Sequence, residues 1–151
     1  MNTLFRARTA RRRFLLVALA TILLLSGCAS TIAVYDAKAY ENATSLKVET
    51  LALMDSAGDV YAQHTEAVTD LRTKLKKAEE YARGLDKNTV AVSMWETLTS
   101  DGGMLDRFFK EWQQGPITPP AYLDDKKEQV SKAFDKLIEL ESRKQKSAGS
   151  R

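Results

Sequence analysis

Cysteine, histidine and proline are scarce in this chain of 151 residues, which holds one Cys, one His and three Pro. A single Cys excludes a disulfide within the monomer. The lone histidine, His64, has no H-E-x-x-H pattern or cysteine partner around it, so zinc has no ligand set. Glycine-rich phosphate loops and the G-x-S-x-G nucleophile motif are also absent from the sequence. These absences argue against a metal, a cofactor and an enzyme.

One long apolar run lies near the N-terminus, behind a basic segment. Residues 1–14 contain five arginines and no acidic residue, and the 12 residues 14–25 are apolar except for Thr21. This length is typical of the core of a signal peptide and falls short of the about 20 residues that a membrane-spanning helix needs. We therefore expect an export signal, with an uncleaved signal anchor as the alternative.

The apolar run ends in Leu25, Ser26, Gly27 and Cys28. This order resembles the lipobox of bacterial lipoproteins, in which an aliphatic residue and two small ones precede an invariant Cys. The resemblance implies that the Cys28 sulfur receives a diacylglyceryl group and that a signal peptidase cuts between Gly27 and Cys28. It also implies that the new amino terminus is acylated, for example with palmitate. A thiolate is the nucleophile that such an alkylation requires.

The residues around the lipobox bear on destination and export route. In lipoprotein sorting an Asp after the Cys favours the inner membrane; Ala29 and Ser30 follow here, so we expect the periplasmic face of the outer membrane. Residues 11–15 also resemble the twin-arginine export signal. Ala10 stands where that motif prefers Ser or Thr, and the very apolar core suits the general secretory route, which we favour.

The basic charge of the chain belongs to the signal. The formal net charge is +3, but without the five arginines of residues 1–27 the rest holds 18 Lys and Arg against 20 Asp and Glu, a net charge of −2. Residues 28–151 therefore lack the basic surface of a nucleic-acid-binding protein. We expect the partners to be the membrane, through the covalent lipid, and another envelope protein.

Helices are expected throughout the mature chain, because Ala, Leu, Lys and Glu dominate and residues 29–115 contain no proline. Apolar residues recur at steps of three and four over residues 39–82, which predicts one helical seam. Gly58 leaves two interpretations open: one continuous helix of about 45–50 residues, or two helices joined at residues 56–59. The seam keeps its phase through Gly58, which favours the continuous helix. His64 lies on this seam, as a core residue or as a pH-sensitive contact.

Further helices are predicted over residues 89–99, 104–114 and 120–143, with breaks near Gly84, at residues 100–103 and at residues 115–119. The predicted fold is an all-α, elongated antiparallel bundle or coiled coil of about three main helices. The expected parts are a signal peptide (1–27), a lipidated N-terminus and tether (28–31), a helical domain (32–143) and a polar flexible tail (144–151). Acid–base pairs at helical spacing, such as Glu79 with Arg83 and Asp106 with Lys110, are expected on solvated helix faces.

The aromatic residues are the remaining feature with a possible function. Trp95, Phe109, Trp112 and Tyr122 lie within 28 residues of one another, which fits either a core thickened at one end or a partner contact, since Trp and Tyr are favoured anchors at interfaces. The leading hypothesis is a non-enzymatic, lipid-anchored structural or interaction module of the cell envelope. The alternative is a periplasmic inhibitor or ligand-binding module that uses the aromatic region around Trp95 and Trp112.

Overall fold

The computed structural model describes residues 33–149, and over this range the chain is all-helical with no strand. This confirms the predicted all-α class. The helices are α2 (Ala37–Met54), α3 (Thr65–Gly84), α4 (Thr89–Thr99), α5 (Met104–Gln114) and α6 (Pro120–Gly149), with two short 3₁₀ helices, η1 (Asp55–Gly58) and η2 (Tyr61–Gln63). The proposed signal peptide, Gly27 and Cys28 lie outside the described residues.

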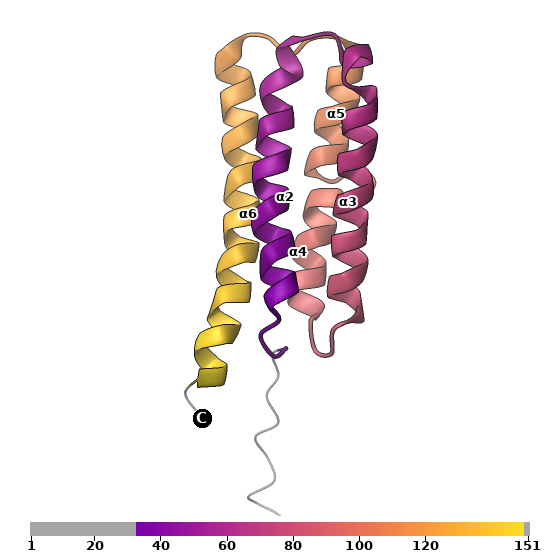
Figure 1. Cartoon of the computed structure of the whole chain (residues 1–151). Coiled ribbons are helices and arrows are strands. Elements are labelled where there is room, and N and C mark those ends of the chain that lie inside the picture. Colours follow the sequence, from indigo (N-terminus) through magenta and orange to yellow (C-terminus); the bar gives the residue numbers. More distant parts are fainter. Residues whose placement is uncertain (1–32, 150–151) are drawn as a thin grey trace, which may run out of the picture. The chain divides into compact units, whose positions relative to one another are not determined.

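The helices form a bundle of four antiparallel rows (Figure 1). The first two rows are α2 and α3, the third is α4 followed end to end by α5, and the fourth is α6. Helix α2 packs against α3 and α6, and α4 packs against the same two helices, so the four rows enclose one core. The expected count of about three main helices is only roughly met, because the first predicted helix forms two helices, α2 and α3.

The fold-back occurs at residues 55–64, where a continuous helix was favoured. Helix α2 ends at Met54, and Asp59 (φ −89°, ψ 172°) and Val60 (φ −71°, ψ 122°) have extended backbone between the two 3₁₀ turns. The Ile117 N–H donates to the Ala57 carbonyl oxygen at 2.8 Å, which ties this turn to the connection before α6. A fold-back places both halves of the apolar seam against one core, whereas a straight helix of that length leaves much of it without a partner.

The buried residues of α2 and α3 confirm that the predicted apolar seam faces the core within each of these helices. Large side chains from every row meet in the core, and each buried Leu, Phe or Met contributes about 1.5–3 kcal/mol relative to an exposed one. Trp95 of α4 and Phe134 of α6 pack edge to face with ring centroids 6.0 Å apart, which joins the third row to the fourth. The main core residues are Ala43, Leu46, Met54, Val68, Leu71, Leu75, Ala78, Ala82, Trp95, Leu98, Leu105, Phe108, Phe109, Trp112, Val130, Phe134 and Leu137.

Two glycines make the predicted break between α4 and α5. Gly102 has a φ of +74°, in the left-handed region that favours glycine. Gly103 is buried, and a Cβ added there lies 2.8 Å from the Ser100 carbonyl oxygen and 3.1 Å from that of Thr97. Only glycine fits this close approach without a shift of the backbone, so the break between α4 and α5 requires a residue without a side chain at position 103.

Helix α6 starts at Pro120, as expected, but ends later than predicted. It continues to Gly149, so residues 144–149, expected as part of a flexible tail, are helical. The tail was predicted from its polar composition, but Lys144 is buried in the bundle. Lys144 donates hydrogen bonds to Asn88 and Glu141, and these contacts hold the helix in place beyond Arg143.

Candidate functional site

Three of the four aromatic residues considered as partner contacts lie in the core. Trp95, Phe109 and Trp112 are buried, and only Tyr122 is exposed, where its hydroxyl donates to Glu111 Oε2 at 3.2 Å. Their apolar surfaces pack inside the bundle instead of forming a patch on it. The aromatic cluster therefore corresponds to the thickened core, and Tyr122 alone is available on the surface.

Trp112 of α5 connects this helix to the turn between α2 and α3. Its Nε1–H donates to the Asp59 carbonyl oxygen at 2.8 Å, and the Tyr61 ring meets it edge-on at 5.3 Å. The His64 ring also packs on Trp112, with centroids 5.3 Å apart, while its Nε2 lies 3.2 Å from Asp59 Oδ2. His64 is thus a half-buried residue of this turn, placed directly before α3, and its contacts are structural.

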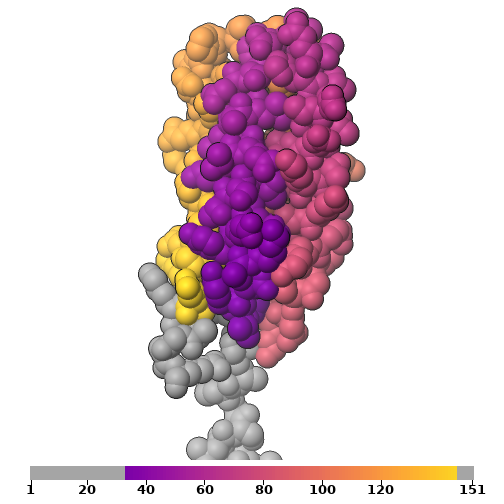
Figure 2. All heavy atoms as spheres, in the orientation of Figure 1, coloured from indigo at the N-terminus to yellow at the C-terminus, as the bar shows by residue number. Residues whose placement is uncertain are grey.

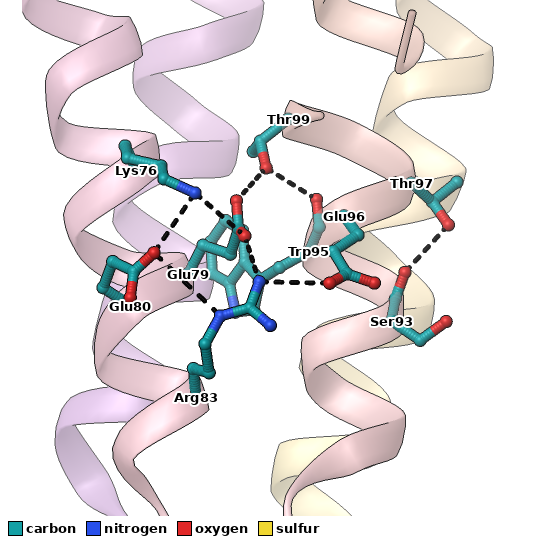
Figure 3. A network of polar contacts seen from close by, with 9 residues as sticks. All are labelled: Lys76, Glu79, Glu80, Arg83, Ser93, Trp95, Glu96, Thr97 and Thr99. Carbon is teal, nitrogen blue, oxygen red and sulfur yellow. Dashed lines mark hydrogen bonds and ion pairs between the residues drawn. The ribbon is translucent and has the colours of Figure 1, made fainter. Parts of the chain in front are cut away.

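A buried carboxylate, Glu79, organises a polar network between α3 and α4 (Figure 3). It accepts hydrogen bonds from Thr99 Oγ1 at 2.7 Å, from Arg83 at 2.6 Å and from Lys76 at 3.2 Å. Burial raises the pKa of Glu79, but the hydrogen bonds from Thr99, Arg83 and Lys76 outweigh it and leave the pKa below its ordinary value. Glu79 therefore stays ionised at neutral pH.

The network extends to the exposed carboxylates on either side of Glu79. Arg83 also donates to Glu96 Oε1 of α4 at 3.0 Å, and Lys76 forms an ion pair with Glu80 at 3.2 Å. Arg83 thus bridges the two helices, as Figure 3 shows. The network is a polar clamp between α3 and α4.

A second buried carboxylate, Asp106, links α5 to α3. It accepts from the Gly102 N–H at 2.8 Å and from Arg72 at 3.2 Å, and it pairs with Lys110 at 2.8 Å. The Lys110 and Gly102 contacts, helped by Arg72 and opposed by burial, lower the pKa of Asp106 to about 2. The Arg72 Cζ atom lies 5.1 Å from the centroid of the Phe109 ring, so the cation of this ion pair also contacts an aromatic residue of the core.

Neither carboxylate is suited to acid–base catalysis. A general acid needs a raised pKa near the working pH, whereas Glu79 and Asp106 have lowered pKa values and several hydrogen-bond donors each. Both carboxylates were expected on solvated helix faces from their spacing, and for these two residues that expectation was wrong. Their spacing to Arg83 and Lys110 is the same as that of a surface pair, so the spacing gave no signal of burial.

A third polar cluster joins α6 to the loop between α3 and α4. Lys144 Nζ donates to both carboxylate oxygens of Glu141 at 2.8 Å and to Asn88 Oδ1 at 2.6 Å. Asn88 Nδ2 donates to the Ala82 carbonyl oxygen at 2.8 Å. Asn88 immediately precedes α4, as expected of an N-cap, but its side chain bridges helices and makes no capping bond. This cluster fixes the last turns of α6.

A shallow hollow of about 550 Å³ lies along α3, beside Arg72 and Lys76. A polar groove lies between α2 and α3. It has a volume of about 480 Å³ and follows the boundary of these helices on the face seen in Figure 2. Its charged walls are largely paired, as in Lys74 with Glu49 at 2.7 Å and Lys38 with Glu41 at 3.2 Å.

Within residues 33–149 no group of three or more His, Cys, Asp or Glu is placed to hold a metal ion. No helix in that range is long and apolar enough to cross a membrane.

Comparisons with protein-family models, with curated proteins and with solved structures give no match for this chain.

Proposed function

We propose that this chain is a lipid-anchored lipoprotein of the bacterial cell envelope that acts as a non-enzymatic structural or protein-interaction module. The observation that carries the proposal is the order of residues 1–28: five arginines, an apolar run of signal-peptide length, and Leu25, Ser26, Gly27 and Cys28. In the mature protein Cys28 is the first residue and carries the lipid. Two or more acyl chains provide stable anchoring without a transmembrane helix.

The position of the helical unit is compatible with such an anchor. Helix α2 begins at Ala37, nine residues after Cys28, so a short tether separates the lipid from the bundle. The bundle has one continuous core, fastened by the ionised networks around Glu79 and Asp106. A rigid helical body of this kind presents its surface to another envelope protein. The proposed location is the periplasmic face of the outer membrane.

The alternative, a module that binds a ligand or a target enzyme through the aromatic region, has less support. It requires Trp95 and Trp112 to be accessible, and both side chains are buried in the folded bundle. A partner is therefore expected on the helix surfaces.

The proposal is tested by replacing the lipidated residue in cells fed a labelled fatty acid. The variant Cys28→Ser is expected to lose the label and to remain at precursor size, because the modified Cys is the substrate of the lipoprotein signal peptidase. Ser26→Ala, which keeps a small residue at that position, serves as the matched control and is expected to behave as the wild type. Mature-sized protein without any lipid label would refute the proposal.

A further inference from the structure

Three segments of the chain meet at one end of the bundle, which we call the basal end (Figure 1). They are residues 33–36 before α2, the loop 85–88 between α3 and α4, and the last turns of α6. The Tyr81 hydroxyl donates to the Asp36 carboxylate at 3.1 Å, which joins the end of α3 to the start of α2. The bond from Lys144 to Asn88 joins α6 to the loop. The basal end is thus one connected surface.

Exposed apolar side chains gather at this end. Val34 is 79% exposed and Val90, the second residue of α4, is 56% exposed, and neither packs in the core. Tyr81, in the last turn of α3, is 39% exposed. Of the six large hydrophobic side chains exposed in the described range, these three lie at the basal end, Val60 and Tyr122 lie at the opposite end, and Val48 lies on α2.

The two ends also differ in charge. At the opposite end, residues 55–64 and 115–127 contain four Asp and two Lys, and Lys127 pairs with Asp55. At the basal end, residues 33–38, 85–90 and 139–145 contain four Lys or Arg and four Asp or Glu, of which Lys144 and Glu141 are buried as a pair. A membrane surface with anionic phospholipids therefore repels the opposite end, with its net charge of −2, more than the basal end, whose charges balance.

The length of the tether sets how far the basal end can lie from the lipid. Ala33 is the fifth residue after Cys28, and a fully extended chain spans at most about 3.6 Å per residue, or about 18 Å over these five steps. The headgroup region on each side of a bilayer is about 5–8 Å thick. A Cys28 whose acyl chains lie in the hydrocarbon region therefore holds the start of α2 close to the headgroups.

We propose that the basal end docks on the phospholipid surface of the leaflet that holds the anchor, with Val34 and Val90 among the headgroups and the acidic end pointing away from the membrane. This inference rests on the lipid anchor proposed above. The docked bundle stands upright, so that the sides of α2, α3 and α6 and the acidic end remain free for protein partners. The lipid thus determines the orientation of the module as well as its location.

Site-specific fluorescence on the full lipidated protein tests this docking. The variants Val90→Cys and Val60→Cys are labelled with an environment-sensitive thiol dye and reconstituted into vesicles of phosphatidylcholine and phosphatidylglycerol. The sulfur of Cys28 is a thioether in the lipidated protein and does not react. Val60 is the matched control, because it is a Val of similar exposure, 54%, in the turn at the opposite end. Some vesicles also contain phospholipids with a spin-label quencher on the acyl chain.

Docking predicts blue-shifted emission and strong quenching at position 90, and solvent-like emission with little quenching at position 60. Equal responses at the two positions, on protein that floats with the vesicles, would overturn the docking and leave the anchor intact. Protein that does not float with the vesicles would refute the anchor and the docking together. Far-UV spectra of both variants confirm that the bundle is folded.

Discussion

Replacing Asp106 with Asn removes the charge of a buried carboxylate whose pKa is lowered to about 2. The Asp106 side chain is 4% exposed and faces Lys110, Arg72 and the Gly102 N–H. Asn is close in size and still accepts hydrogen bonds, so the substitution tests the charge more than the packing. Asp101, an exposed residue of the same break, provides the matched control Asp101→Asn.

The pKa of Asp106 gives the size of the effect. A fall from 3.8 to about 2 corresponds to ~2.4 kcal/mol of stability, since one pKa unit is about 1.4 kcal/mol. Lys110 and Arg72 are partly exposed, with side-chain exposures of 61% and 42%, so solvent screening reduces the expected loss in Asp106→Asn to about 1–2 kcal/mol. For a domain of this size that loss lowers the Tm by about 3–6 °C.

The pH dependence has a defined sign. Because the pKa is lowered in the folded state, the contribution of Asp106 is fully present above the unfolded pKa of 3.8 and is lost as the pH falls through about 2. Urea unfolding followed by circular dichroism at pH 7 and at steps down to pH 2 measures it. Wild type and Asp106→Asn are expected to differ at pH 7 and to converge toward pH 2. A difference that is independent of pH, or as small as that of Asp101→Asn, would refute the reasoning.

Three further substitutions test other parts of the fold by the same unfolding measurement. Gly103→Ala is expected to lower the free energy of unfolding by about 1–3 kcal/mol, because the added Cβ meets backbone atoms at 2.8–3.1 Å. The control Gly84→Ala is expected to stay near the wild type, because a Cβ there meets nothing within 4 Å. Trp112→Phe loses the bond to the Asp59 carbonyl oxygen and should cost about 1–3 kcal/mol; a change within about 0.5 kcal/mol would show that this bond does not hold the turn. Thr50→Val is expected to stabilise by about 1 kcal/mol, since the buried Thr50 hydroxyl has no hydrogen-bond partner; a loss of stability would contradict this.

The sequence was informative about helices and their buried faces. The steps of three and four over residues 39–82 identified core positions such as Ala43, Leu71 and Ala82, because helical geometry brings residues at this spacing to one face. The breaks at Gly84 and at residues 100–103 followed from residue types that end helices. These features are local, so a local pattern suffices to predict them.

Features that depend on which segments meet were not predictable in this way. The phase of the seam through Gly58 is the same for a straight helix and for two helices that fold back, and only tertiary packing decides between them. Glu79 and Asp106 carry the spacing of solvated pairs, but Thr99 and Arg72 reach them from neighbouring helices. The burial of Trp95 and Trp112 likewise depends on partners far away in the sequence, such as Phe134 and Asp59.

The intact mass and N-terminal fragment masses of the protein purified from cell envelopes test the central claim most directly. The proposed lipid anchor predicts a chain of residues 28–151 whose first residue is Cys28 and whose mass exceeds that of the polypeptide by a diacylglyceryl group, with or without a third acyl chain. A chain that begins at another residue, or that begins at Cys28 with an unmodified thiol, would contradict it.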